Sequence, residues 1–134
     1  MSNAAAATQS SATTEAVVRK HLDAFINQKG VAAILADYAP SARLHTAQAV
    51  FQGPGEIHRF FADFLDSLPP DAYERFTLDA LRIDGELAFI TWSVGKSIPL
   101  GTDTFVVRNG KIEAQTVALL ANKERPSDTR SPGA

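Results

Sequence analysis

The sequence contains no cysteine, one methionine and one tryptophan in 134 residues. Because cysteine is absent, disulfides and thiolate metal sites are excluded, and cysteine usage says nothing about the redox compartment. The three histidines (His21, His45 and His58) lack a ligand spacing such as H-x-x-x-H, so no metal is expected. A glycine-rich phosphate loop is also missing from the sequence. These absences predict a protein that works without a metal, a nucleotide or another cofactor.

Charge and hydrophobicity exclude further classes of protein. The formal net charge is -2, so neither nucleic acid nor an anionic membrane is an expected partner. No apolar run approaches the roughly 20 residues that a membrane-spanning helix requires. The first twelve residues lack the basic and strongly apolar segments of a signal peptide. We therefore expect a cytoplasmic protein.

The composition predicts one folded domain with polar ends. The 45% apolar and 21% charged content is ordinary for a globular protein, and a chain of this length can bury an adequate core. Residues 1–12, rich in alanine, serine and threonine, are predicted to form a disordered leader. Residues 122–134 are polar with two prolines and are predicted to form a flexible tail. The folded unit is then residues 13–121.

Periodic apolar residues predict three helices in the first half of the chain. The first runs from Thr13 or Thr14 to Gly30, the second from Val31 to Pro40, and the third from Gly53 to Pro69. A hydroxyl side chain can cap the start of the first helix, and prolines end the other two. His21 lies within the apolar stripe of the first helix, which makes it a candidate for a buried or cavity-facing position.

The remaining segments predict strands. Two short strands are expected over residues 42–46 and 49–52, and an antiparallel meander follows Tyr73, with a break at residues 99–101. A shift of apolar parity after Ala80 predicts a β-bulge. Two dipeptides predict tight hairpin turns: Asp84-Gly85 and Asn109-Gly110. This order of elements indicates an α+β fold in which helices close one face of a long curved sheet.

Asp103 is the residue that most strongly indicates chemistry. On its predicted strand it shares a face with Phe105 and Val107. A carboxylate on an apolar face must be paired, hydrogen-bonded, protonated or open to a pocket, because burying a bare charge is prohibitively costly. Asp103 is therefore either a pocket residue or a structural carboxylate bonded to backbone amides or to His21.

The element order, the Asp-x-Phe strand, the Asn-Gly-Lys-Ile turn and Tyr38-Ala39 before a short strand resemble the nuclear transport factor 2-like superfamily. Within it, the chain is most similar to the SnoaL-like and ketosteroid-isomerase-like branch, over about Thr14 to Leu120. The resemblance implies a cone-shaped α+β fold, with three N-terminal helices packed on a curved, mostly antiparallel mixed sheet. It also implies an apolar pocket between the two layers and a homodimer formed through the outer face of the sheet.

The ketosteroid isomerases offer the sharpest comparison within that branch. By position, Asp103 matches their proton-donating carboxylic acid, His21 their oxyanion-hole tyrosine and Thr46 their proton-abstracting aspartate. A threonine hydroxyl cannot act as a base near neutral pH, so a poor ketosteroid isomerase is expected, and Thr46→Asp is expected to supply the missing base. Related epoxide hydrolases carry a carboxylate near the position of Val117, and related polyketide cyclases carry one on the last strand near Gln115. This sequence has no carboxylate at either place.

The resemblance implies a pocket for an apolar, carbonyl-bearing small molecule. Its expected acid–base residues are Asp103 and His21, within hydrogen-bonding reach directly or through one water. Its expected lining is Leu44, Thr46, Tyr38, Phe61, Trp92 and Phe105. The leading interpretation is a cofactor-independent isomerase, cyclase or dehydratase. The alternative is a non-catalytic ligand-binding or dimerisation domain, in which His21 is a satisfied boundary histidine and the aromatic residues are core.

Overall fold

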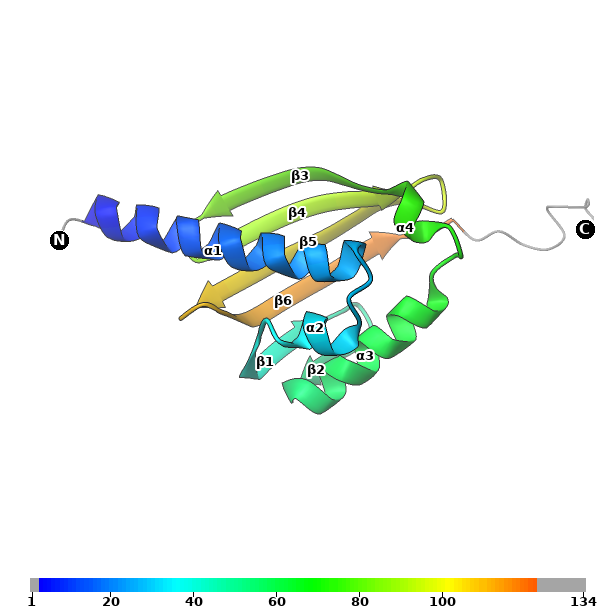
Figure 1. The fold of residues 1–134 in the computed structure, drawn as a ribbon, viewed down its shortest axis with the longest axis horizontal. Coiled ribbons are helices and arrows are strands. Elements are labelled where there is room, and N and C mark those ends of the chain that lie inside the picture. Colours follow the sequence, from blue (N-terminus) through cyan, green and yellow to red (C-terminus); the bar gives the residue numbers. More distant parts are fainter. Residues whose placement is uncertain (1–2, 123–134) are drawn as a thin grey trace, which may run out of the picture.

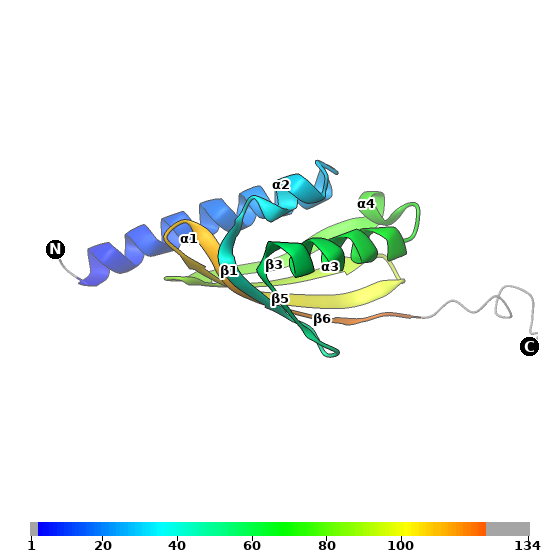
Figure 2. The same ribbon diagram turned by 90° about the horizontal axis from the view of Figure 1, so that it is seen from below.

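In the computed structural model, which describes residues 3–122, helices lie on one face of a six-stranded sheet (Figures 1 and 2). The described helices are α1 (Asn3–Ile26), α2 (Val31–Leu35), α3 (Gly53–Ser67) and α4 (Ala72–Arg75). The strands are β1 (Tyr38–His45), β2 (Val50–Gln52), β3 (Phe76–Asp84), β4 (Leu87–Val94), β5 (Ile98–Arg108) and β6 (Lys111–Leu120). Residues 123–134 of the predicted tail and residues 1–2 of the predicted leader lie outside the described residues.

The sheet has the strand order β2-β1-β6-β5-β4-β3. β1 pairs with β6 in parallel, and the other neighbouring pairs are antiparallel. The sheet curves under the helices and its two edges, β2 and β3, do not meet (Figure 1). The predicted fold class, helices packed on a curved and mostly antiparallel mixed sheet, is therefore confirmed.

Local sequence signals predicted both hairpin turns and the bulge to within about two residues. Asn109 and Gly110 have φ angles of 54° and 76° between β5 and β6, as a tight hairpin turn requires. The turn between β3 and β4 consists of Gly85, with φ 60°, and Glu86, one residue later than the predicted Asp84-Gly85, because Asp84 still pairs with Leu87. The pairing of β3 with β4 shifts between Leu78 and Ala80, where the parity change predicts a bulge.

The N-terminal helix begins at Asn3, well before the start predicted at Thr13 or Thr14, so most of the predicted leader is helical. Alanine-rich sequence favours helix, and two hydroxyl groups fasten this one to the sheet. Thr14 is buried and its Oγ1 donates a hydrogen bond of 2.7 Å to the carbonyl oxygen of Gly85. The Gly85 N–H donates one of 2.9 Å to Ser11 Oγ. These contacts span more than seventy residues of sequence, which local patterns do not predict.

Two strands extend beyond their predicted ends. Tyr38 and Pro40 belong to β1 and not to the second helix, which ends earlier. The parallel pairing with β6 starts at Tyr38 and is irregular as far as Arg43, and such an irregularity tolerates a proline. β5 also continues through residues 99–101, where a break was predicted.

The core lies between the helices and the sheet. Val18 of α1, Ile57 of α3 and Ile90 of β4 are buried there. Within the described residues no helix covers the opposite face of the sheet, which exposes Leu87 and Phe89 of β4 (Figure 2). None of the described helices has the length and hydrophobicity needed to cross a membrane.

Candidate functional site

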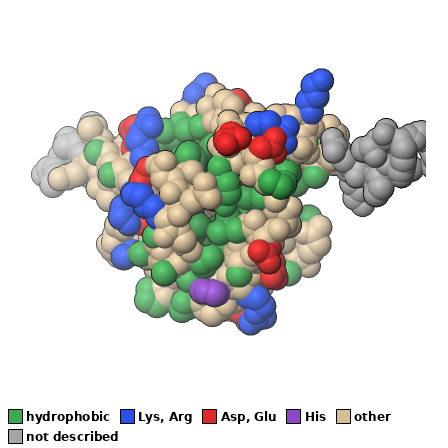
Figure 3. Space-filling model, turned by 45° about the vertical axis from the view of Figure 1, so that its right-hand side comes forward, with side chains coloured by type: hydrophobic (Ala, Val, Ile, Leu, Met, Phe, Trp, Pro, Cys, Tyr) green, Lys and Arg blue, Asp and Glu red, His purple; other side chains and the backbone are tan. Residues whose placement is uncertain are grey.

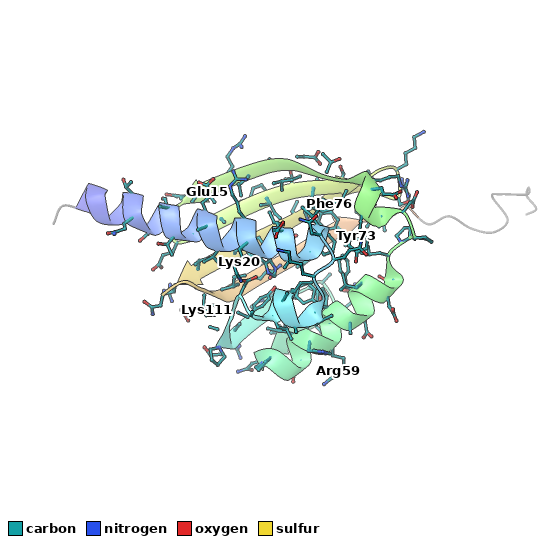
Figure 4. The ribbon with its side chains drawn as sticks, in the orientation of Figure 1. Glu15, Lys20, Arg59, Tyr73, Phe76 and Lys111 are labelled. Atoms are coloured by element: carbon teal, nitrogen blue, oxygen red, sulfur yellow. The ribbon has the colours of Figure 1, made fainter. Side chains whose placement is uncertain are left out.

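A cavity of about 60 Å³ lies between α1, α3 and the sheet. Its apolar wall consists of Leu22, Phe25, Phe60, Phe61, Phe64, Phe76, Ile90, Trp92, Phe105 and Val117. Three polar side chains interrupt this wall: His21, Asp103 and Gln115. On the side that faces α4 and the end of α3, hydrophobic side chains gather in the middle of the molecular surface, with charged groups around them (Figure 3). Phe76 and Tyr73 lie beside the C-terminal end of α1, where both rings contact Phe25 (Figure 4).

Most of the predicted site residues meet at this cavity. Those in its wall are Asp103, His21, Trp92, Phe105 and Phe61. Tyr38 lies behind the wall, where its hydroxyl group hydrogen-bonds His21 and Gln115. Leu44 and Thr46 do not line this cavity, because Leu44 is fully buried in the core and Thr46 follows the end of β1. Strand parity predicts which face a side chain occupies, but not how far along that face the cavity reaches.

Thr46 serves a structural turn beside a second hollow. Its Oγ1 accepts hydrogen bonds from the N–H groups of Gln48 and Ala49. The hollow beside it has a volume of about 230 Å³ and shares Phe60, Phe64 and Val117 with the first cavity. An aspartate at position 46 could accept the same hydrogen bonds, but its carboxylate would lie at the second hollow and not at the cavity that Asp103 lines. The structure therefore does not support Thr46→Asp as a way to supply a base beside Asp103.

Asp103 is buried, and both of its carboxyl oxygens accept hydrogen bonds. Trp92 Nε1–H donates to Oδ1 and Gln115 Nε2–H donates to Oδ2, each at 2.7 Å. Burial raises the pKa of Asp103 to about 6, although the two hydrogen bonds and the charge of His21 act in the opposite direction. A carboxyl group with such a pKa can gain or lose a proton near neutral pH. As a structural carboxylate, Asp103 was expected to bond to backbone amides or to His21. Its partners are instead the side chains of Trp92 and Gln115.

Gly101 allows Trp92 to reach Asp103. Gly101 of β5 lies directly opposite Trp92 of β4. A Cβ atom at Gly101 would lie only 2.2 Å from the indole of Trp92, so the ring crosses β5 where a side chain is missing. The Phe76 ring stacks on the indole at a centroid distance of 5.8 Å. Glycine at position 101 is thus a packing requirement of the site and not a strand break.

His21 forms no direct pair with Asp103, so the direct form of the predicted pair is wrong. His21 Nδ1 lies 3.2 Å from Asp37 Oδ2, and Nε2 lies 3.3 Å from the Tyr38 hydroxyl oxygen. Both ring nitrogens are therefore occupied by residues at the start of β1. His21 and Asp103 are instead connected through Tyr38 and Gln115.

Asp37 and Gln115 are the site residues that sequence reasoning missed. Asp37 is 4% exposed and accepts a hydrogen bond of 2.6 Å from Lys20 Nζ as well as the contact from His21. Burial opposes ionisation, but the hydrogen bonds and charges of His21 and Lys20 lower the pKa of Asp37 below its usual value. Lys20 extends from the side of α1 that faces α2 (Figure 4). Gln115 lies opposite Phe105 on the cavity face because the pairing of β5 with β6 shifts between Val106 and Val107, which the sequence does not reveal.

The sequence matches the family model of the SnoaL-like domain over residues 18–115. Several crystal structures resemble the fold. A protein from Kribbella flavida DSM 17836, named as a candidate ketosteroid isomerase, is 22% identical, with a TM-score of 0.64 over 87% of this chain and 84% of the other. An NTF-2 like protein of unknown function from Burkholderia xenovorans LB400 is 17% identical, with a TM-score of 0.68 over 85% and 88%.

A de novo designed protein with a curved β-sheet has the same TM-score of 0.68, at 20% identity over 90% of this chain and 88% of the other. Likeness at this level of identity therefore shows the fold and not an activity. No curated protein matches the sequence. Within the described residues, no group of three histidine, aspartate or glutamate side chains is placed to hold a metal ion. The family match spans most of the folded domain, and the chain belongs to the SnoaL-like domain family of the nuclear transport factor 2-like superfamily.

Proposed function

We propose that this chain is a cofactor-independent acid–base enzyme, of the isomerase, cyclase or dehydratase kind, acting on an apolar carbonyl compound. The observation that supports this most is the carboxyl group of Asp103 in the wall of an apolar cavity, with its pKa raised to about 6. Above that pH the carboxylate form predominates. Asp103 would then accept a proton from the carbon beside the carbonyl group and return it at another position.

The chemistry and size of the cavity restrict the ligand. Aromatic and aliphatic side chains make up most of its wall, and no lysine or arginine of the described residues lines it, so a phosphorylated compound would lose its hydration without a compensating charge. The volume of about 60 Å³ is below the ~150 Å³ of an apolar cavity that holds benzene. A larger ligand would therefore have to displace Phe60 and Phe64, which separate this cavity from the second hollow.

A second candidate function is ligand binding without catalysis. It is favoured by the hydrogen bonds that both oxygens of Asp103 already receive from Trp92 and Gln115. Each oxygen retains one further lone pair, which could orient a ligand without exchanging a proton. In this case the same apolar ligands bind, but no proton transfer follows.

A thermal-shift screen tests the ligand class that both candidates share. We expect hydrophobic ketones to raise the unfolding temperature by several degrees near saturation, because a ligand at about 100 times its Kd contributes about 2.7 kcal/mol. Val117→Phe should fill the cavity and abolish the shift, whereas His58→Phe, on the exposed side of α3, should preserve it. Stabilisation by sugar phosphates but not by ketones would contradict the proposal.

We also propose a homodimer formed through the outer face of the sheet. That face exposes Leu87 and Phe89 of β4 and Leu100 of β5, and Leu120 of β6 lies directly opposite Leu100. Exposed apolar side chains gathered on one face favour a partner surface. Light scattering at micromolar concentration should give the mass of two chains. Phe89→Lys should give a monomer and Gln48→Lys, in the turn after β1, should not. A monomeric wild-type protein at every concentration would contradict the dimer.

A further inference from the structure

The polar side chains behind the cavity form one continuous series of hydrogen bonds. It begins at the surface with Lys20, whose side chain is 68% exposed, and ends at the buried Asp103. The members in order are Lys20, Asp37, His21, Tyr38, Gln115 and Asp103. The titratable groups of the series are Lys20 and His21 from α1, Asp37 from the connection between α2 and β1, Tyr38 from the start of β1, and Asp103 from β5.

Each link needs one donor and one acceptor, so the protonation of one end restricts the other. An ionised Asp103 only accepts, and Gln115 must therefore turn its amide N–H toward it. The Gln115 oxygen then receives the single hydroxyl hydrogen of Tyr38. Because burial raises the pKa of Tyr38 well above its usual value, this hydroxyl keeps its hydrogen. The oxygen of Tyr38 is left to accept a hydrogen bond from His21 Nε2–H.

The other end of the series determines the second nitrogen of His21. The hydrogen bonds from His21 and Lys20 outweigh burial and lower the pKa of Asp37, so this carboxylate is ionised and accepts from His21 Nδ1–H. With Asp103 ionised, His21 therefore donates from both nitrogens and is an imidazolium cation.

The reverse arrangement satisfies the same atoms. A protonated Asp103 donates to the Gln115 oxygen, the amide turns over and its N–H donates to Tyr38. The Tyr38 hydroxyl group then donates to His21 Nε2, which must carry no hydrogen. Both arrangements give every link in the buried part of the series one donor and one acceptor, and each contains one proton that is held by either His21 or Asp103.

We propose that Tyr38 and Gln115 couple the proton of Asp103 to the proton of His21, so that one residue holds it when the other does not. Gln115 is the positioning residue, because its amide presents either N–H or oxygen to Asp103. When Asp103 accepts a proton from a bound compound, the network favours loss of the proton on His21 Nε2, which can leave through the cavity because His21 is part of its wall. The total charge of the buried series then stays the same. This role rests on the proposed function, but the coupling itself is a property of the unliganded protein.

The test is nitrogen NMR of ¹⁵N-histidine-labelled protein without ligand, which shows whether His21 Nε2 carries a hydrogen. The ratio of protonated to unprotonated Nε2 is measured at one near-neutral pH in wild type, Asp103→Asn, Gln115→Met and the double variant. We expect Asp103→Asn to lower this ratio about tenfold, the equivalent of one buried hydrogen bond. In the Gln115→Met background the same change should alter the ratio by less than about twofold, because the connecting amide is missing.

Comparing these four proteins as a double-mutant cycle separates the proposed coupling through hydrogen bonds from electrostatic attraction through space. A direct effect of the Asp103 charge on His21 would be equally large in both backgrounds, and that result would overturn the proposal, as would the absence of any effect of Asp103→Asn. Asp79→Asn, which removes an exposed carboxylate from β3, should leave the ratio unchanged. If Gln115→Met does not fold, Tyr38→Phe breaks the neighbouring link and keeps the ring. Intact coupling in a protein that exchanges no ketone protons would contradict the proposed function and not this inference.

Discussion

Replacing Asp103 with asparagine is expected to slow proton exchange on an apolar ketone by a factor of about 10² to 10⁴, the usual contribution of a general acid–base residue. Asparagine keeps the size of the side chain and can still accept the hydrogen bond from Trp92, but it cannot take up a proton. The substrate is an activated β,γ-unsaturated ketone. Isomerisation is followed by absorbance, and uptake of deuterium beside the carbonyl group is followed by NMR.

The pH dependence and a matched variant sharpen this test. Wild-type activity should rise with pH through about 6, as Asp103 becomes a carboxylate, and the residual activity of Asp103→Asn should lack that rise. Asp79→Asn, on the exposed side of β3, should be as active as wild type. Equal activity of Asp103→Asn and wild type would make Asp103 structural. A wild-type protein that binds ketones without exchanging their protons would favour the non-catalytic candidate.

The same Asp103→Asn substitution is expected to stabilise the folded protein by roughly 2–3 kcal/mol at about pH 8. The pKa of Asp103 is about 6 in the folded protein, compared with an ordinary value of 3.8. Between these values the folded state binds more protons than the unfolded state, so stability falls as pH rises through this window and stays lower above it. Asparagine carries no charge and avoids this loss. A residue selected for chemistry would thus reduce stability, a common trade-off in active sites.

Urea unfolding of wild type and Asp103→Asn at about pH 8 and about pH 4 measures this effect. The stabilising difference should be present at the higher pH and nearly absent at the lower, where the wild-type carboxyl is protonated in the folded state. Asp37 contributes in the opposite sense: its pKa is lowered, so it stabilises above its ordinary pKa and this contribution is lost as pH falls. That contribution is common to both proteins and cancels in their difference. An equal difference at both pH values would show that the charge of Asp103 does not limit stability.

Local chemistry made several features of this protein predictable from sequence. Asn109-Gly110 predicted a hairpin turn because these residues readily adopt positive φ angles, and the structure has them. Alternation along a strand predicted that Asp103 and Phe105 face the same layer, and both line the cavity. The ends of α3 followed from glycine and proline at Gly53-Pro54 and Pro69-Pro70. Each of these depends only on residues close together in the chain.

Only the tertiary structure decided which polar groups meet. The partners of Asp103 come from β4 and β6, and those of His21 from the start of β1, at sequence separations that carry no local signal. Packing also decided that Ser11 and Thr14 of α1 hydrogen-bond to the β3–β4 turn, and that Thr46, which follows the end of β1, lies outside the cavity. Periodicity determines the face that a side chain occupies, because it reflects backbone geometry. The distance between two side chains depends on how helices and strands pack, and this is why the sequence predicted the apolar setting of Asp103 and His21 but not their connection through Tyr38 and Gln115.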